Sequence, residues 1–285
     1  MAVSIEPHIR FVRVEAPTRF RSLDVVRVER ISPHMTRVTL GGPEIASFTS
    51  VGWDDDIRMQ LPLNFSHVPQ PPVIETNPWR MVFPDGAPAT ESRAYTIRKL
   101  DHDVGEMVLD MVLHGEGLAT RWAEQARPGH VVTVAGPWGS RVIEGQFAHY
   151  LFLGDETAMP AIGRSIEALP AGSKVTVVVE VASLEDAQTW QSASGVEIDY
   201  RWLVRGPNDR PGRNSLLLEA LTTIEKPAGP LYIYGAGEST TLREIRRHLV
   251  ARWDVDKKHL NLAGYWKRED DETDWFYHED EADAE

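Results

Sequence analysis

Short stretches in which apolar and polar residues alternate dominate the first half of the chain. Alternation with a period of two residues is typical of half-buried β-strands. The pattern predicts a single helix here, 118–126, and a long surface loop in the proline-rich residues 64–89. Strands at this spacing predict an antiparallel barrel. The predicted strands are 23–30, 35–40, 57–63, 92–98, 106–113 and 130–135.

Apolar runs and helical patterns alternate from about residue 147 onward. This alternation predicts a parallel sheet with helices on both faces. Ligands of such sheets lie beyond the carboxyl ends of the strands, so residues 154–157 and 235–238 are predicted to share one rim. The predicted strands are 150–153, 174–181, 200–204, 231–234 and 260–266; the predicted helices are 158–169, 215–221 and 240–253, with a helical turn at 185–191.

The two patterns divide the chain into four parts and give the fold class as β-barrel plus α/β. Residues 1–20 form an N-terminal extension, 21–146 the barrel, 147–268 the parallel-sheet domain and 269–285 a tail. Two domains suit a chain of 285 residues.

Negative charge is concentrated in the tail. The chain carries a net charge of −13, and residues 269–285 contain ten acidic residues and no Lys or Arg, so removing those ten charges leaves −3 on the rest. Such a tail is typical of a disordered, solubilising segment. The adjacent aromatics Trp275, Phe276 and Tyr277 indicate instead that part of it docks on the body.

Composition excludes several classes of protein. The absence of cysteine excludes disulfides, thiolate iron–sulfur ligation and cysteine nucleophiles, and it fits a reducing, cytoplasmic compartment. No basic stripe favours nucleic-acid binding. No apolar run approaches the roughly 20 residues of a membrane helix, and residues 1–15 lack the apolar core of a secretory signal.

The segment Arg93-Ala94-Tyr95-Thr96 is the first candidate for binding chemistry. On a strand, Arg93 and Tyr95 share one face and Thr96 lies on the other. Taken alone, this is also an ordinary strand with a surface arginine. Followed closely by a phosphate-binding turn, it can hold a flavin.

Such a turn follows some twenty residues later. His114-Gly115-Glu116-Gly117 leads from a strand into the predicted helix that begins with Leu118-Ala119-Thr120. Free amides at a helix N-terminus attract phosphate. Gly117 permits close backbone approach, and Thr120 can donate its hydroxyl to a phosphate beside these amides.

Taken together in this order, these segments and several others resemble the ferredoxin–NADP reductase superfamily, and more finely the siderophore-interacting proteins, which are FAD-dependent ferric-siderophore reductases. The resemblance covers about residues 20–268 and depends on the joint order of its motifs. The matching stretches are 93–98, 109–115, 121–123, 126–129, 136–140, 154–162, 235–238 and 264–268.

The resemblance implies roles for the residues of the barrel. Arg93 would lie near the FAD pyrophosphate, with Ala94 beside it; Tyr95 would pack on the ring system and Thr96 would hydrogen-bond near the flavin. The family runs the backbone of Asp110, Met111 and Val112 along the flavin and brings His114 and Gly115 to the phosphates. Thr157 and Trp266 are further candidates for flavin contact. Where the family commonly has Pro-Ala-Ser, this chain has Leu118-Ala119-Thr120, which keeps a hydroxyl and loosens the turn slightly.

The sequence signal for a nicotinamide site is weaker than the signal for the FAD site. The rim residues Asp155, Glu156, Gly235, Ala236, Gly237 and Glu238 are the NAD(P)H candidates. They also suit a plain helix start capped by Asp155 or Thr157, and a plain strand-to-helix turn, and two acids in one segment would repel a pyrophosphate. Glu180 would favour NADH and Arg205 NADPH. Some relatives take electrons from ferredoxin, so that donor also stays open.

The resemblance implies a basic site for an anionic ferric siderophore. Its candidates are Arg58, Arg141, Lys267 and Arg268, each of which is alternatively a solvated surface cation. The family usually has His-Val-Lys where this chain has Asp56-Ile57-Arg58. Trp138 also stands where an arginine is common, so a pocket of altered charge is expected.

The sequence therefore predicts a ferric-siderophore reductase that uses FAD and NAD(P)H to release Fe(II). No side chain need act as acid, base or nucleophile, so no catalytic residue and no resident metal site is predicted. Two alternatives stay open: a general flavin or quinone reductase, and a siderophore-binding protein without redox function. The sequence does not identify the siderophore, the donor or the oligomeric state.

Overall fold

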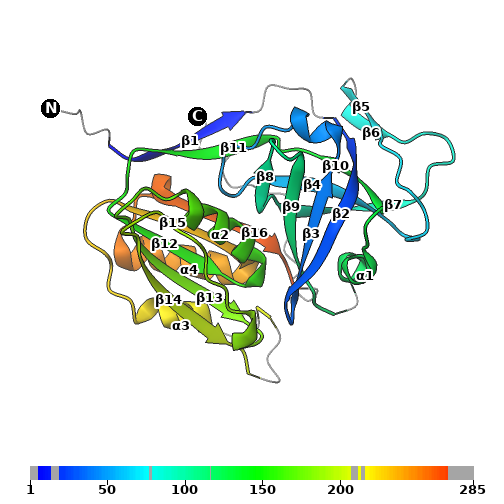
Figure 1. Ribbon diagram of the computed structural model, residues 1–285. Helices are drawn as coiled ribbons and strands as arrows, with labels where there is room; N and C mark the ends of the chain where they lie inside the picture. The colour runs from blue at the N-terminus through cyan, green and yellow to red at the C-terminus, as the bar shows by residue number, and fades with distance from the viewer. Residues whose placement is uncertain are drawn as a thin grey trace. The chain divides into compact units, whose positions relative to one another are not determined.

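The computed structural model describes residues 6–13, 19–76, 79–115, 117–206, 211–212 and 216–268 (Figure 1). The chain forms two compact units. The first unit comprises Met1–Gln146, Pro160–Ala171 and Glu185–Ser194, and the second comprises Phe147–Met159, Gly172–Leu184 and Gly195–Glu285. The first unit thus takes in two segments from beyond residue 147, including most of helix α2 (Met159–Ala168).

A seven-stranded antiparallel sheet is the centre of the first unit. Alternate residues of its strands, such as Leu23, Val38, Met59 and Leu109, form one buried core because their side chains share a face. Helix α1 (Leu118–Gln125) packs Trp122 into this core. In spatial order the strands are β7 (Thr90–Thr96), β4 (Asp56–Pro62), β10 (Val131–Ala135), β2 (Arg21–Ser32), β3 (Met35–Gly41), β9 (Glu106–Val112) and β8 (Lys99–Asp101).

The predicted antiparallel barrel is an open, curled sheet. Within the described residues, β7 and β8 are its two edges and no ladder of hydrogen bonds joins them. Since β8 pairs only with residues 106–108 of β9, residues 109–112 are paired with β3 alone. Two unpaired strand edges result: one edge of β7, which carries the Arg-x-Tyr-Thr motif, and the second half of β9 on the side away from β3.

Two small antiparallel ribbons complete the first unit (Figure 1). Strand β1 (His8–Arg13), from the predicted N-terminal extension, pairs with β11 (Gly139–Glu144). Strands β5 (Val73–Thr76) and β6 (Trp79–Val82) form a hairpin within residues 64–89. The prediction of one long surface loop over residues 64–89 missed these two strands, in which Val73 and Ile74 face Val82 and Met81, all residues that favour strands or pack well in them.

A five-stranded parallel sheet is the centre of the second unit. Helices α3 (Leu216–Thr222) and α4 (Ser239–Trp253) cover one face through a core that includes Leu153, Ile233 and Leu249. The alternate residues Tyr150, Phe152 and Tyr232 form an aromatic cluster. In spatial order the strands are β14 (Glu197–Val204), β13 (Lys174–Val181), β12 (His149–Gly154), β15 (Leu231–Glu238) and β16 (Leu260–Trp266).

Short 3₁₀ helices occupy several turns: η1 (Pro43–Ser47), η2 (Glu156–Ala158), η3 (Leu184–Asp186) and η4 (Lys257–His259). In the part of the chain that the structure describes, no helix is both long and apolar enough to cross a bilayer. The tail prediction lies outside the described residues.

Candidate flavin site and nucleotide rim

Strand β7 presents the predicted flavin motif near its end. The Arg93 side chain is 44% exposed, and its Nη2 donates to Glu91 Oε2 at 2.6 Å. Tyr95 packs against the core of the first unit, and burial raises the pKa of its phenol. Thr96 is buried. Arg93 Nη1 also donates to Ser92 O at 2.9 Å. Arg93 therefore offers a surface cation, and its one charged partner among these contacts, Glu91, is itself an exposed side chain that a bound anion could replace.

The chain just after this motif is held firmly. Ile97 N donates to Asp55 O at 2.8 Å, and from helix α2 Arg164 Nη1 donates to Ile97 O at 3.1 Å. The two terminal nitrogens of Arg98 donate to the Glu167 carboxylate at 2.8 and 2.5 Å. Neither Arg164 nor Glu167 was predicted as a site residue; their spacing of three residues, which puts both on one helix face, was the available signal.

At its unpaired edge, strand β9 can offer a ligand backbone N–H and C=O groups rather than side chains. Arg37 Nε and Nη2 donate to the two oxygens of buried Asp110 at 2.7 and 2.8 Å, a bidentate pair. This hydrogen bonding raises the pKa of Arg37. Met111 is fully buried and Val112 half-buried. The carboxylate of Asp110 is thus committed to Arg37, and only the backbone role predicted for residues 110–112 fits this arrangement.

The turn into α1 is open to solvent. His114, Gly115 and Gly117 are exposed, and a Cβ placed on either glycine would meet nothing within 4 Å. Gly115 has a φ of +55°, which glycine adopts without strain. The Thr120 hydroxyl donates to His114 O at 3.0 Å and accepts from His114 N at 3.2 Å. It closes the turn, so its predicted phosphate bond would compete with these contacts.

These residues fit an FAD pyrophosphate. Gly117 precedes α1 and has no side chain to cap the helix amides, and the space around the two glycines lets a phosphate approach. Arg93 adds a guanidinium suited to two phosphate oxygens. Leu118 is buried in the core and Ala119 packs against it, so these two residues hold the helix in place rather than contact a ligand through polar groups.

Asp155 is the first carboxylate at the carboxyl ends of the parallel strands. Its Oδ1 accepts from Thr157 N at 2.8 Å and Thr157 Oγ1 at 2.5 Å, and its Oδ2 accepts from Trp266 Nε1 at 2.7 Å. Burial raises the pKa of Asp155 to about 6, although these hydrogen bonds oppose the shift. Of the two sequence-based alternatives, the structure has Asp155 as the cap of η2.

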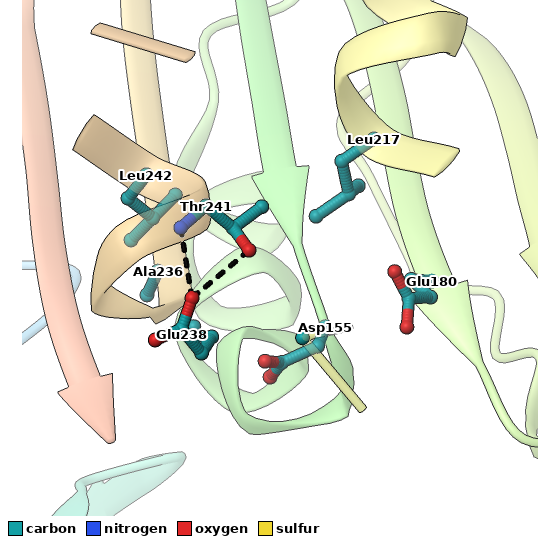
Figure 2. A pocket seen from close by; sticks show the side chains of 9 residues that line it. Asp155, Glu180, Leu217, Ala236, Glu238, Thr241 and Leu242 are labelled. Carbon is teal, nitrogen blue, oxygen red and sulfur yellow. Dashed lines mark hydrogen bonds between the residues drawn. The ribbon is translucent and has the colours of Figure 1, made fainter. Parts of the chain in front are cut away.

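Glu238 is the second carboxylate at the carboxyl ends of the parallel strands. Its Oε2 accepts from Thr241 N at 2.8 Å and from Thr241 Oγ1 at 3.0 Å, so it caps helix α4 (Figure 2). Its Oε1 is buried without a hydrogen bond and lies 3.8 Å from Arg268 Nε. The 3₁₀ helix η2 and helix α4 are therefore each capped by a carboxylate of the chain itself.

Glu156 and Glu180 share a buried arginine. Arg205 Nη1 donates to Glu156 Oε2 at 2.9 Å and to Glu180 Oε1 at 3.2 Å, and Arg205 Nη2 bonds Glu156 Oε1. Burial acts against the charge, but the hydrogen bonds and charge of Glu156 raise the pKa of Arg205. Glu180 and Arg205, the opposing candidates for donor choice, are thus paired with each other inside the protein, with Glu156 as a second partner of the arginine.

The rim glycines pack against the protein itself. Gly235, Ala236, Gly237 and Glu238 belong to β15 and are all buried, so the prediction that the strand ends at residue 234 was wrong. A Cβ on Gly235 would lie 2.6 Å from a Leu153 methyl group, and one on Gly237 would lie 2.7 Å from Asp155 Oδ2. Neighbouring strands on both sides of β15 leave no room for larger residues.

The space left at the rim is small and acidic. Asp155, Glu180 and Glu238 line a pocket with Leu217 and Leu242 (Figure 2). Its free volume is about 10 Å³, room for one water molecule. This pocket therefore has no room for a pyrophosphate, and the NAD(P)H contacts of the rim residues stay predictions.

Comparison with known proteins decides the family. Residues 24–141 match the family model of the siderophore-interacting FAD-binding domain, and residues 147–269 match that of the siderophore-interacting protein. The chain is 34% identical over 260 residues to the NADPH-dependent ferric-chelate reductase of Escherichia coli (strain K12), covering 89% of this chain and 95% of that protein. The chain belongs to the siderophore-interacting protein family.

Three further proteins are similar to this chain in sequence or in fold. The ferric vibriobactin reductase ViuB of Vibrio cholerae is 30% identical over 261 residues, covering 91% of this chain and 93% of its own. The crystal structure of a siderophore utilization protein from T. fusca matches with a TM-score of 0.81 and 36% identity, covering 94% and 99%. A cytochrome P450 reductase of Amycolatopsis, at 15% identity and a TM-score of 0.60, shares the fold.

These matches confirm the predicted family, the fold class and FAD as a cofactor. The individual cofactor and substrate contacts stay predictions for this siderophore-interacting protein. Arg58 is exposed on β4, and Arg141 Nη1 lies 3.9 Å from Asp54 Oδ2, both in the first unit. In the second unit Lys267 is half-buried, and Arg268 Nη1 donates to Gly212 O at 2.9 Å. Arg268 is thus partly committed to its own unit.

Proposed function

We propose that this protein is an FAD-dependent reductase that takes electrons from NADPH and reduces the Fe(III) of a ferric siderophore, releasing Fe(II). Two observations carry the proposal: the turn before α1 is open, and Arg93 is exposed, in a chain that matches an FAD-binding domain. The names of the relatives in E. coli and V. cholerae support the substrate class.

The chain's own contribution is to bind and orient. Arg93 and the α1 amides would hold the pyrophosphate, Tyr95 would pack on the ring system, and the fixed segment at Ile97 would keep both in place. Bound FAD supplies the chemistry that joins a two-electron hydride donor to a one-electron acceptor. Fe(II) binds hard oxygen donors more weakly than Fe(III), so reduction frees the metal.

The substrate site in this proposal is basic. Arg58, Arg141, Lys267 and Arg268 would attract an anionic chelate. Residues 21–146 would act as the FAD-binding domain and 147–268 as the nicotinamide-binding type, with 1–20 and 269–285 as extensions. A cytoplasmic location and ferredoxin as a second donor stay predictions.

Anaerobic stopped-flow spectroscopy of the FAD-loaded protein tests the proposal. NADPH should bleach the flavin absorbance, and a panel of ferric siderophores should restore it while a ferrous-specific chelator records Fe(II). A quinone or dye that is reduced far faster than every ferric chelate would favour a general flavin or quinone reductase. A colourless protein that binds ferric siderophore but no FAD would refute redox function.

A further inference from the structure

We propose that the buried carboxylate of Glu238, supported by that of Asp155, weakens the binding of phosphate-bearing nicotinamide donors at the rim of the parallel sheet. The inference depends on the proposed function in taking NADPH as the donor. It makes Glu238 a residue that sets donor affinity, and it follows from where negative charge lies in the second unit.

Anions at such a rim are normally held by helix N-termini. The amides of the first turn are unpaired within the helix and carry partial positive charge, so they attract phosphate. Here Glu238 Oε2 already accepts from Thr241 N at 2.8 Å, and Asp155 Oδ1 already accepts from Thr157 N at 2.8 Å. A pyrophosphate would find both amides occupied and a negative charge beside each.

The need to cap helix α4 does not by itself explain why a glutamate stands at position 238. Ser, Thr, Asp and Asn are the usual capping residues, with side chains short enough to reach the helix amides directly. Glu238 is 3% exposed, and its second oxygen, Oε1, has no hydrogen bond. A buried carboxylate oxygen left in this way is costly. A serine would cap α4 without burying an unpaired carboxylate oxygen. Capping therefore does not explain why this position carries the negative charge of a glutamate.

The surroundings do not remove this charge from the rim. Arg205 is bound to Glu156 and Glu180, and Arg268 Nε forms an ion pair with Glu238 Oε1 at 3.8 Å without a hydrogen bond, so Arg268 compensates the charge of Glu238 only in part. Among the described residues, no group of carboxylates and histidines is arranged to hold a metal ion. Electrostatic repulsion acts over several ångströms in a low-dielectric pocket, so a dinucleotide phosphate near this rim is disfavoured.

The test removes the charge and keeps the cap. Glu238→Gln retains an oxygen that can accept from Thr241 N, and Glu238→Ser supplies a preferred capping residue. The matched control is Glu197→Gln, which removes the same charge from an exposed position at the amino end of β14, away from the rim. Thermal unfolding of each variant first establishes that it folds.

Two donors then separate repulsion from other effects. The KM for NADPH is compared with that for N-benzyl-1,4-dihydronicotinamide, a neutral hydride donor without phosphate. Both Glu238 variants should lower the KM for NADPH by roughly three- to tenfold and leave that of the neutral donor unchanged; the control should change neither. An unchanged or higher KM for NADPH, or an equal fall for both donors, would overturn the proposal.

A binding measurement keeps this inference separate from the proposed function. The Kd of NADP⁺ for each variant is measured by calorimetric titration, without turnover. If NADPH fails to reduce the flavin of the unaltered protein, the proposed donor is wrong, but a lower Kd of the Glu238 variants for NADP⁺ still supports repulsion at the rim. An unchanged Kd refutes it.

Discussion

Arg205→Met should destabilise the second unit without changing the choice between NADPH and NADH. Arg205 is 8% exposed and bonds both Glu156 and Glu180, whose side chains are 6% and 4% exposed. Methionine fills much of the volume of the arginine stem but provides no donor. Two buried carboxylates then lose their shared cation.

The size of the effect follows from burial. Removing one partner of a buried ion pair costs about 3–5 kcal/mol, because a charge stays in the interior uncompensated. Glu156 Oε1 keeps one donor, Ala182 N at 2.7 Å, and protonation of one carboxylate limits the loss. We therefore expect a loss of about 3 kcal/mol in the free energy of unfolding, or very roughly 6–15 °C in Tm.

Urea and thermal unfolding, followed by circular dichroism, measure this loss. The control is Arg201→Met on the same strand, since Arg201 and its partner Asp199 are exposed at 36% and 53%; it should change stability by less than about 0.5 kcal/mol. A loss below about 1 kcal/mol for Arg205→Met would refute the reasoning. A tenfold rise in the KM for NADPH with unchanged stability would instead mean that Arg205 binds the 2′-phosphate.

Three further changes test other parts of the structure. Arg93→Ala should raise the Kd for FAD at least roughly tenfold through lost charge-assisted bonds, as measured by flavin fluorescence, whereas Arg80→Ala, which breaks the similar exposed pair with Glu75, should not; equal FAD affinity in both variants would move the phosphate site elsewhere. Because burial raises the pKa of Asp155 to about 6 from 3.8, the folded state holds its proton more tightly and this group's contribution to stability falls as pH rises from about 4 to about 6. Relative to Asp155→Asn, the unaltered protein should therefore lose up to about 3 kcal/mol between pH 4 and pH 7 in urea unfolding, and parallel pH profiles would contradict the shift. Arg58→Ala combined with Lys267→Ala should raise the KM for an anionic ferric siderophore and spare flavin reduction by NADPH; unchanged chelate kinetics would put the basic site elsewhere.

Periodicity alone determined most of the elements. Strands 174–181 and 260–266 were predicted with the bounds they have as β13 and β16, because apolar residues dominate each of these short runs. The flavin motif and the turn at His114 were also visible in the sequence, since both consist of residues close together along the chain. The hairpin of β5 and β6 was missed because proline-rich surroundings masked two short strands.

Only the tertiary structure decided how the rim residues are used. The sequence places Asp155, Glu180, Arg205, Glu238 and Trp266 on different elements, and no local pattern says which carboxylate meets which donor. Folding brings Trp266 Nε1 to Asp155 across 111 residues and Arg205 to Glu156 across 49. In the sequence, Gly235 and Gly237 suggest an open phosphate-binding loop. In the folded protein, the space beside these glycines is occupied by neighbouring residues such as Leu153 and Asp155. Secondary structure follows from local spacing, whereas the charge that a ligand meets depends on contacts between residues far apart in sequence, and these exist only after the sheet has formed.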